Sequence, residues 1–503
     1  MSESTESVTI IVKNVKSKLT GISPTTLNLL SKELSIRANG YFFSTAYRHK
    51  MWDGYEHFLS RPANTFPTGL LPMVINFLKE SCELNVILKD ERKSTHIVLN
   101  PVEKKFKISE YKISRDYQVD AMNSIFLGKV EGIPFPRGVI NIATNGGKTL
   151  IAEGVIKNLY DQLQPNEVFL FLTHSKEIAF QAQKSILNDL GIEVGFIGSS
   201  QWDVKPITVA IITTLHRRLK DKKDEFMKLK DNVIGFVADE CHHTSSESWN
   251  AVLNKFDSAY IRFGLTGTVD KKNRVNEMKL YSCTGNILIK ISNDFLINEG
   301  VSAKPICVLF KVSVPELGDL EYQDAYQAGI VSNIERNELI YEICKKETDA
   351  GNTVLVLVEY IEHGKNIEEF LQLLNRRVHF TNGSLSNQER ADLLDRLKDG
   401  DLDVLISSNI LDEGVDVSGI NAIVYARGLK SPRKLLQGLG RGLRLKSDNS
   451  NLRFYDFIDD THRKLLEHSK QRFDILVKEK FQIKLMNVVK YREASWKSLN
   501  LEF

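Results

Sequence analysis

Short apolar runs alternate with polar stretches of helical length through most of this chain. Between residues 137 and 268 the runs predict buried strands at 138–142, 168–172, 207–212 and 233–237. Runs that are apolar throughout are typical of strands buried on both faces. Strands that alternate with helices at this spacing build βαβ units. We therefore expect a parallel sheet with helices on both of its faces.

The same pattern begins again near residue 300 and continues to about residue 460. It predicts strands at 354–358, 402–406 and 422–425, with 454–458 as the last strand of the second sheet. After Thr461 the pattern is that of a long amphipathic helix reaching Lys480. The expected fold class is therefore α/β, with two parallel-sheet domains of one type in tandem.

The residues before about 110 have a different pattern. They contain short β-like pieces at 9–12 and 97–99, one helical stretch and no phosphate loop. We expect a small α+β accessory domain over residues 1–108. The two parallel-sheet domains would then occupy residues 109–300 and 301–503, and the second would include the C-terminal helix.

Composition narrows the class of protein. The chain has 503 residues, 42% hydrophobic and 26% charged, with a net charge of +3, which is typical of a soluble multidomain protein. A nucleic-acid surface would have to be a local basic stripe. The five cysteines form no Cys-x-x-Cys pair, and no apolar run is long enough to cross a membrane. We expect a cytoplasmic monomer with no structural metal and no membrane segment.

A glycine-rich turn follows the predicted strand at 138–142. Residues 143–149 read Ala-Thr-Asn-Gly-Gly-Lys-Thr and lead into an apolar stretch that begins a helix. Such a turn directs backbone N–H groups at a phosphate, and Lys148 can reach the β and γ phosphates while the Thr149 hydroxyl binds Mg²⁺. Position 142 is isoleucine, where a strict phosphate loop has glycine, so a tight turn that binds nothing is the alternative. The predicted nucleotide-binding residues are Thr144, Asn145, Gly146, Gly147, Lys148 and Thr149.

An acidic pair follows the predicted strand at 233–237. The sequence there is Asp239-Glu240-Cys241-His242. Asp239 can hold the Mg²⁺ that bridges nucleotide phosphates, and Glu240 can orient and deprotonate the attacking water. A solvated turn bearing two carboxylates is the alternative. The upstream Lys148 and the strand directly before the pair favour the catalytic interpretation.

An ordered series of such motifs resembles that of the superfamily 2 helicases over residues 110 to 480. The resemblance implies two RecA-like domains that bind ATP and Mg²⁺. It implies that Arg115 and Gln118 read the adenine, that residues 265–268 couple hydrolysis to movement, and that His242 links the acidic motif to the last motif. Further motif residues implied to contact the nucleic-acid backbone are Thr173, His174, Ser175, Gln181, Thr213, Thr214, Ser407 and Ser408. Gly414 and Asp416 are implied to contact the nucleotide.

The last motif also has a physical interpretation. Gln437, Arg441 and Arg444 recur at helical spacing and share one face. Two guanidinium groups on that face could reach a γ-phosphate, where an arginine from another module accelerates phosphoryl transfer by about 10³ to 10⁵. A solvated basic helix face is the alternative. Glycines at 438, 440 and 442 argue for a close backbone approach instead, because an interior helical glycine costs about 1 kcal/mol.

Two segments outside this series resemble the UvsW-type fork-remodelling helicases of phages. They are residues 47–54, Tyr-Arg-His-Lys-Met-Trp-Asp-Gly, and residues 66–71, with a looser likeness at 468–481. The resemblance implies a DNA helicase or translocase that acts on forks and four-way junctions, on single-stranded and duplex DNA. Arg48, Trp52 and the nearby aromatic residues could stack on an exposed base at a junction. They could equally fill a small core.

Three other functions stay open at this point. The chain could translocate on duplex DNA without separating strands, or it could be an RNA helicase. It could also be an inactive motor that serves as a DNA-binding scaffold, although the charged residues needed for hydrolysis are all present.

Overall fold

The computed structural model describes residues 7–269, 273–372, 377–382, 387–408, 420–443, 452–488 and 491. The chain forms two compact units. One contains Met1–Ile142 with Gly147–Ile291, and the other contains Ser292–Phe503 together with Ala143–Gly146. No helix among the described residues is long and apolar enough to span a membrane.

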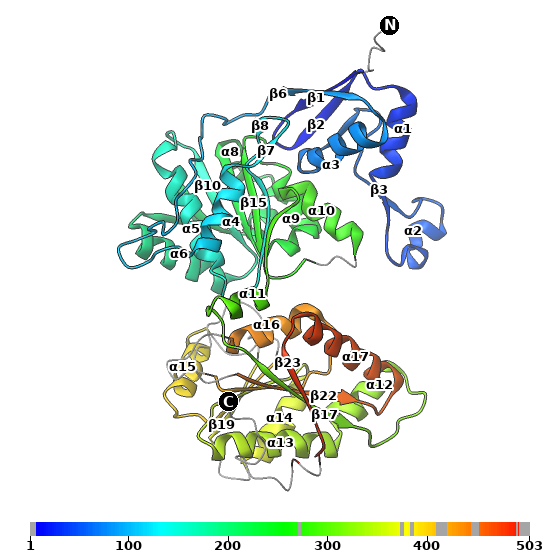
Figure 1. The fold of residues 1–503 in the computed structure, drawn as a ribbon, viewed down its shortest axis with the longest axis vertical. Helices are drawn as coiled ribbons and strands as arrows, with labels where there is room; N and C mark the ends of the chain where they lie inside the picture. The colour runs from blue at the N-terminus through cyan, green and yellow to red at the C-terminus, as the bar shows by residue number, and fades with distance from the viewer. Residues whose placement is uncertain are drawn as a thin grey trace. The chain divides into compact units, whose positions relative to one another are not determined.

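The first unit contains an eight-stranded sheet with the order β12-β11-β13-β10-β14-β15-β9-β16. Figure 1 labels β10 and β15 of this sheet, with helices packed around them. Every neighbouring pair is parallel except the β11–β12 pair at one edge. The four predicted strands are confirmed as β9 (Arg137–Ile142), β10 (Val168–Thr173), β13 (Ile207–Ile211) and β14 (Val233–Asp239). The other four are β11 (Val194–Gly198), β12 (Gln201–Asp203), β15 (Ile261–Thr266) and β16 (Ile287–Ile291).

Helices connect the parallel strands, as a right-handed βαβ arrangement requires. They are α5 (Lys148–Leu159), α6 (Lys176–Leu190), α7 (Ile212–Lys220), α8 (Asp224–Asn232), α9 (Glu247–Leu253) and α10 (Arg274–Thr284), while α4 (Asp116–Phe126) precedes β9. Strands β9, β10 and β14 are buried along their whole length because helices cover both faces of the sheet.

The N-terminal part of the first unit has a small sheet of its own, with the order β5-β2-β1-β6. Its elements are β1 (Ser7–Val12), β2 (Lys16–Thr20), β5 (Thr65–Pro67) and β6 (Asn85–Asp90), with α1 (Pro24–Glu33) and α3 (Leu71–Asn76). The strand predicted at 9–12 is confirmed as part of β1. The strand predicted at 97–99 is wrong, because the Gln162 side-chain amide binds both the N–H and the C=O of Val98. The backbone of residues 97–99 is therefore bound by a side chain of the 3₁₀ turn η4 (Tyr160–Gln162) and is not part of a strand.

The small sheet shares an apolar core with the larger sheet of the same unit. Val8 and Ile10 of β1 belong to one continuous cluster of buried side chains with Val139 of β9. Arg137 at the start of β9 donates to the Asn14 carbonyl at 2.9 Å, and Gly69 lies against the backbone of α10. The predicted domain boundaries at residues 108 and 300 stay predictions.

The second unit contains a seven-stranded, entirely parallel sheet with the order β19-β20-β18-β21-β22-β17-β23. Its strands are β17 (Ile306–Val312), β18 (Val354–Leu357), β19 (Val378–Thr381), β20 (Val404–Ser407), β21 (Ala422–Tyr425), β22 (Arg453–Asp459) and β23 (Gln482–Met486). Its helices include α11 (Asn293–Asn298), α12 (Tyr322–Tyr326), α13 (Ile334–Asp349), α14 (Ile361–Gln372), α15 (Asn387–Lys398), α16 (Pro432–Gly442) and α17 (Arg463–Lys478).

The long helix predicted after Thr461 is confirmed as α17, and the α/β fold class is confirmed for both large sheets. The prediction that the strand at 454–458 is the last one is wrong, because β23 follows α17 and pairs in parallel with β17. Strand β23 mixes polar and apolar residues and is only half-buried, with Leu485 exposed. It therefore lacks the continuous apolar run that marks the central strands.

We expect Gly69→Ala to destabilise the junction between the two sheets of the first unit. Gly69 is buried, and an added Cβ would overlap the backbone carbonyl oxygen of Tyr281, which has little freedom to move. Overpacking of this kind costs roughly 1–3 kcal/mol or more, so thermal unfolding should shift to lower temperature. Gly132→Ala is the control, because that position has open space around it and only a positive φ of 82° to strain. An equal or smaller shift for Gly69→Ala than for Gly132→Ala would contradict the close packing.

Candidate nucleotide and nucleic-acid site

The carboxyl ends of parallel strands bring the predicted site residues of the first unit to one edge of its sheet. Strands β14, β15 and β9 are neighbours, with Asp239 opposite Leu265 and Thr266 opposite Asn141. The acidic pair, the end of β15 and the start of the glycine-rich turn therefore lie side by side. In open α/β sheets this edge is where ligands bind.

The glycine-rich turn has a left-handed backbone at two of its positions. Asn145 and Gly147 both have positive φ, 71° and 87°, and Gly146 N donates to Ala143 O at 3.1 Å. Helix α5 begins at Lys148 directly after this turn, so its first N–H groups are available to an anion. The twelve residues of α5 give the helix a substantial dipole behind that position.

Lys148 forms an ion pair with Glu240, and both side chains are largely buried. Glu240 has a positive φ of 47° and its N–H donates to Asp239 Oδ1 at 3.0 Å. A left-handed conformation costs a non-glycine residue about 1–2 kcal/mol. The turn after β14 therefore holds the two carboxylates in a strained arrangement that directs Glu240 toward Lys148.

His242 joins Glu240 to the end of β15. Its Nδ1 lies 2.9 Å from Thr266 Oγ1 and 3.3 Å from Glu240 Oε2. Thr266 Oγ1 is itself 3.4 Å from Glu240 Oε2 and donates to the Thr268 carbonyl at 3.0 Å. The acidic motif is thus coupled to residues 266–268 inside the first unit. The predicted link from His242 to the last motif stays a prediction.

Burial and mutual attraction set the charges of this cluster. Burial raises the pKa of the Asp239 carboxyl to about 6, in spite of the nearby Lys148 ammonium. Burial acts to raise the pKa of Glu240 as well, but the Lys148 charge and the hydrogen bond with His242 outweigh it and hold that pKa well below its usual range. Burial acts to lower the pKa of Lys148, and the two carboxylates reverse this effect and raise it.

The residues at this edge fit a nucleotide with Mg²⁺. The positive φ of 87° at Gly147 favours glycine there, and an added Cβ would also have to displace the side-chain amide of Gln118. Gln118 is buried in the first turn of α4 and accepts from Arg115 N at 2.9 Å, while the Arg115 side chain is exposed. Thr149 and Asp239 could supply oxygen ligands, and Mg²⁺ usually takes its remaining ligands from phosphate and water.

The predicted nucleic-acid contacts of the first unit lie at the same edge, because β13, β10 and β14 are neighbours. Thr173 ends β10 and is buried, and its hydroxyl accepts from Ser175 N at 3.4 Å. Ser175 caps α6 by accepting from Ile178 N, and Gln181 is exposed on the second turn of that helix. The His174 ring lies 4.3 Å from that of His243. Thr213 is exposed and Thr214 is half-buried in the first turn of α7.

The predicted contacts of the second unit are described only in part. Ser407 ends β20 and Ser408 follows it, and both are buried, with Ser407 Oγ donating to Ser408 O at 3.0 Å. The positions outside the described residues are Gly414, Asp416 and Arg444. Gln437 and Arg441 belong to α16, but their side chains are not described. Their predicted roles stay predictions.

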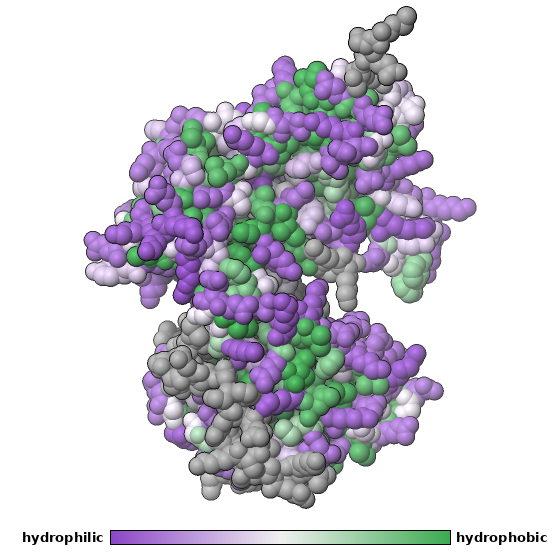
Figure 2. Space-filling view, viewed as in Figure 1, coloured by the Kyte–Doolittle hydropathy of each residue, from purple (hydrophilic) through white to green (hydrophobic). Residues whose placement is uncertain are grey.

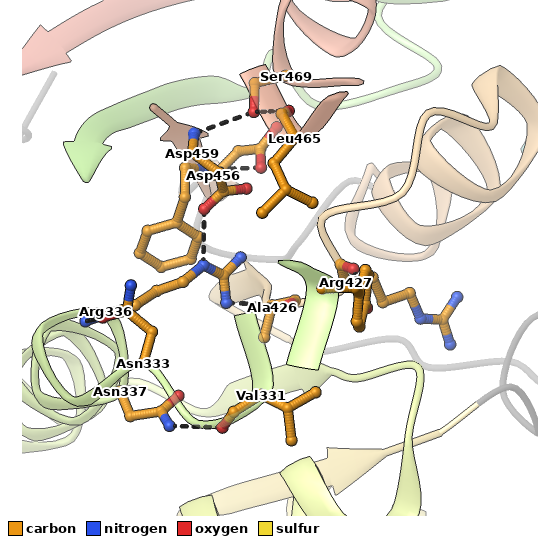
Figure 3. Close-up of polar contacts among 12 residues, drawn as sticks. Val331, Asn333, Arg336, Asn337, Ala426, Arg427, Asp456, Asp459, Leu465 and Ser469 are labelled. Carbon is orange, nitrogen blue, oxygen red and sulfur yellow. Dashed lines mark hydrogen bonds and ion pairs between the residues drawn. The ribbon is translucent and has the colours of Figure 1, made fainter. Parts of the chain in front are cut away.

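Sequence reasoning missed a buried ion network in the second unit (Figure 3). Arg336 of α13 donates from Nε to Asp459 Oδ1 at 2.8 Å, and Arg472 of α17 donates from Nε to Asp456 Oδ2 at 2.9 Å. Ser469 Oγ accepts from Asp459 N at 3.0 Å. All of these side chains are buried. The only sequence signal is a pair of carboxylates inside the apolar strand β22.

This network also holds the chain that leads from β21 to α16. Arg336 Nη1 donates to the Ala426 carbonyl at 3.0 Å, and Arg472 Nη1 donates to the Leu429 carbonyl at 3.4 Å. Ser431 then caps α16 by accepting from Lys434 N at 3.4 Å. Helices α13 and α17 therefore fix the starting point of the helix that carries Gln437 and Arg441.

Two known families match separate parts of the chain. Residues 112–271 match the family described as "Type III restriction enzyme, res subunit", and residues 335–446 match "Helicase conserved C-terminal domain". The first match contains the glycine-rich turn and the acidic pair, and the second contains α16. The chain is a superfamily 2 helicase. Members of this superfamily are ATP-hydrolysing enzymes with two RecA-like domains, which confirms the fold and the enzyme class that the sequence predicts.

Individual relatives match this helicase to different extents. The ATP-dependent DNA helicase uvsW of Enterobacteria phage T4 is 22% identical over 497 residues, which are 92% of this chain and 96% of the phage protein. The putative ATP-dependent helicase IRC3 of Saccharomyces cerevisiae is 27% identical over 368 residues, 69% of this chain. The chain spans about half of that yeast relative, 51% of its length.

A solved structure supports the fold of the helicase alone. It is a fragment of a putative HsdR subunit of a type I restriction enzyme from Vibrio vulnificus YJ016. Its TM-score is 0.56 at 18% sequence identity, and the match covers 79% of this chain and 72% of the fragment.

We expect Arg472→Met to destabilise the second unit by roughly 3–5 kcal/mol, because it leaves Asp456 buried without its cation. Arg472→Met combined with Asp456→Leu should lose less than the sum of the two single variants, which urea unfolding of all four proteins would measure. Lys311→Met is the control, since it breaks an exposed ion pair with Asp460 and should cost at most about 1 kcal/mol. Additive losses in the double variant would contradict a direct interaction.

Proposed function

We propose that this helicase uses ATP hydrolysis to move along DNA and that it remodels branched DNA, such as forks and four-way junctions. The observation that carries the proposal is the buried cluster of Lys148, Asp239 and Glu240 beside a turn in which Gly147 has the left-handed backbone that favours glycine. The DNA substrate is supported by a relative named as an ATP-dependent DNA helicase that matches 92% of this chain. The branched substrate is supported by the likeness of residues 47–54 and 66–71 to the fork-remodelling helicases.

The ion pair suggests how substrate binding prepares the catalytic base. Without nucleotide, the Lys148 ammonium keeps the Glu240 carboxylate ionised and holds it in an ion pair. A triphosphate in the turn attracts Lys148 more strongly, since it carries more negative charge than one carboxylate. Glu240 then loses its cation, its pKa rises, and it becomes a better acceptor for a proton from the attacking water. Mg²⁺ at Thr149 and Asp239 would neutralise charge on the phosphates.

The contacts of His242 suggest how a structural change at the nucleotide site reaches the rest of the first unit. His242 and Thr266 both contact Glu240, so a shift of that carboxylate changes the hydrogen bonds at the end of β15. Helix α10 packs against β15 and against the 3₁₀ turn η5 (Cys241–Ser245), which contains His242, and Gly69 of the N-terminal part lies against α10. The events at the nucleotide are thereby connected to the N-terminal sheet through contacts inside one unit.

Translocation on duplex DNA without strand separation is a second candidate. It is favoured by the match of residues 112–271 to the family described as the res subunit of type III restriction enzymes. Strand displacement on a forked substrate separates the two functions, because a pure translocase would leave both arms paired.

We expect Lys148→Ala to lower the ATPase rate by about a hundredfold or more, because the turn loses its cation for the phosphates. Glu240→Gln should still bind ATP and should hydrolyse it slowly, since the amide cannot accept a proton. Lys184→Ala, at an exposed lysine of α6, is the control and should retain wild-type turnover.

The assay should compare stimulation by single-stranded, duplex, forked and four-way DNA and by RNA. The proposal predicts the strongest stimulation by forked or four-way DNA. Wild-type turnover in Lys148→Ala would contradict the assignment of the site, and stimulation by RNA alone would contradict the DNA substrate.

A further inference from the structure

A short segment of the N-terminal part lies outside its four-stranded sheet and is closed at its base by two strands that pair with each other. It comprises residues 35–57, begins with β3 (Ser35–Arg37) and ends with β4 (Tyr55–His57). Between these strands lie the 3₁₀ turn η1 (Tyr41–Phe43) and the single-turn helix α2 (Thr45–Arg48). Figure 1 shows this segment projecting from the rest of the N-terminal part, with α2 at its far end. We refer to residues 35–57 as the aromatic excursion.

Polar contacts make the base of the aromatic excursion well defined. Asp53 accepts from Tyr55 N at 3.0 Å and pairs with His57 at 2.8 Å. The Trp52 indole N–H donates to the Tyr55 carbonyl at 2.8 Å. The Arg37 guanidinium lies 4.2 Å from the centre of the Tyr41 ring. Trp52 and Tyr41 are therefore occupied in holding the excursion together.

Three large apolar side chains at the tip are largely exposed, although the Phe42 ring lies edge-on to that of Tyr41, with 5.6 Å between the ring centres. Phe42 is 53% exposed, Phe43 is 73% exposed and Met51 is 75% exposed, and the two phenylalanine rings lie 4.3 Å apart. In Figure 2 apolar atoms are visible on the surface at the end of this excursion. Exposing large apolar side chains next to one another on an ordered segment is costly in water, and such patches commonly mark binding sites.

The charges around the tip favour a polyanion over a protein groove. Arg48, His49 and Lys50 follow closely in the sequence and are exposed, and Arg48 Nη2 donates to the Phe43 carbonyl at 2.8 Å. The two acidic residues of the excursion are engaged elsewhere, Asp53 with His57 and Glu56 with Lys279 of α10 at 3.4 Å. The tip thus presents aromatic faces and cations together, the combination that binds unpaired nucleic acid.

We propose that Phe42 and Phe43 form a stacking site for unpaired DNA bases, with Arg48 and Lys50 binding the flanking phosphates. This inference rests on the proposed function, since it assigns the recognition of unpaired strands at a branch to the aromatic excursion. It moves the stacking role from Trp52 to the two phenylalanines. The Glu56–Lys279 ion pair joins the excursion to α10, which is part of the unit that holds Lys148 and the acidic pair.

The test is the affinity of full-length variants for a fork whose unpaired arm carries 2-aminopurine. Phe43→Ala should weaken binding to this fork about tenfold, because a stacked base contributes roughly 1–3 kcal/mol, and should reduce the quenching of the 2-aminopurine fluorescence. Phe43→Tyr should bind as the wild type does, because its ring stacks equally well. Phe43→Leu should behave as Phe43→Ala, since leucine is apolar but offers no aromatic face.

The control is Tyr111→Ala, which removes an aromatic side chain that is 94% exposed elsewhere in the same unit and should change nothing. Wild-type binding by Phe43→Leu would overturn stacking. Unchanged binding to the fork by Phe43→Ala, together with a loss of self-association in sedimentation, would overturn the proposal in favour of an interface between copies of the chain. If the wild type itself binds no DNA, the proposed function fails; if it binds and the variants match it, this inference alone fails.

Discussion

The ion pair between Lys148 and Glu240 is the interaction on which the candidate site depends. Both groups are buried, so each would be costly without the other. Their attraction keeps a lysine charged at the start of α5 and a carboxylate charged at the end of β14. Parallel pairing of β9, β15 and β14 provides this juxtaposition, because the three strands end at one edge. A triphosphate offers the lysine a stronger partner, and that exchange converts a stable resting arrangement into a reactive one.

The second unit uses buried charge differently. Its arginines Arg336 and Arg472 are paired with Asp459 and Asp456, and they bind backbone carbonyls that precede α16. These four side chains are buried between two helices and a central strand. Buried ion pairs therefore lie at the candidate nucleotide site in the first unit and support the backbone that leads into α16 in the second.

The sequence predicts the parts of the fold that depend on local patterns. The central strands, α17 and the glycine-rich turn follow from continuous apolar runs, helical periodicity and turn chemistry. Strand β23 could not be predicted, since an edge strand with mixed polarity lacks that signal, and residues 97–99 misled because the Gln162 amide binds their backbone. The Arg336–Asp459 pair joins residues 123 positions apart. Which aromatic residues near Trp52 are exposed is likewise decided by tertiary packing.

The most direct measurement is a crystal structure of the helicase with a non-hydrolysable ATP analogue and Mg²⁺. We expect the Lys148 ammonium to leave Glu240 and contact a phosphate, with Thr149 and Asp239 facing the metal ion. We also expect Glu240 to keep its contact with His242 and to turn toward the γ-phosphate. A nucleotide bound elsewhere, or bound in the turn while Lys148 stays paired with Glu240, would contradict the central claim.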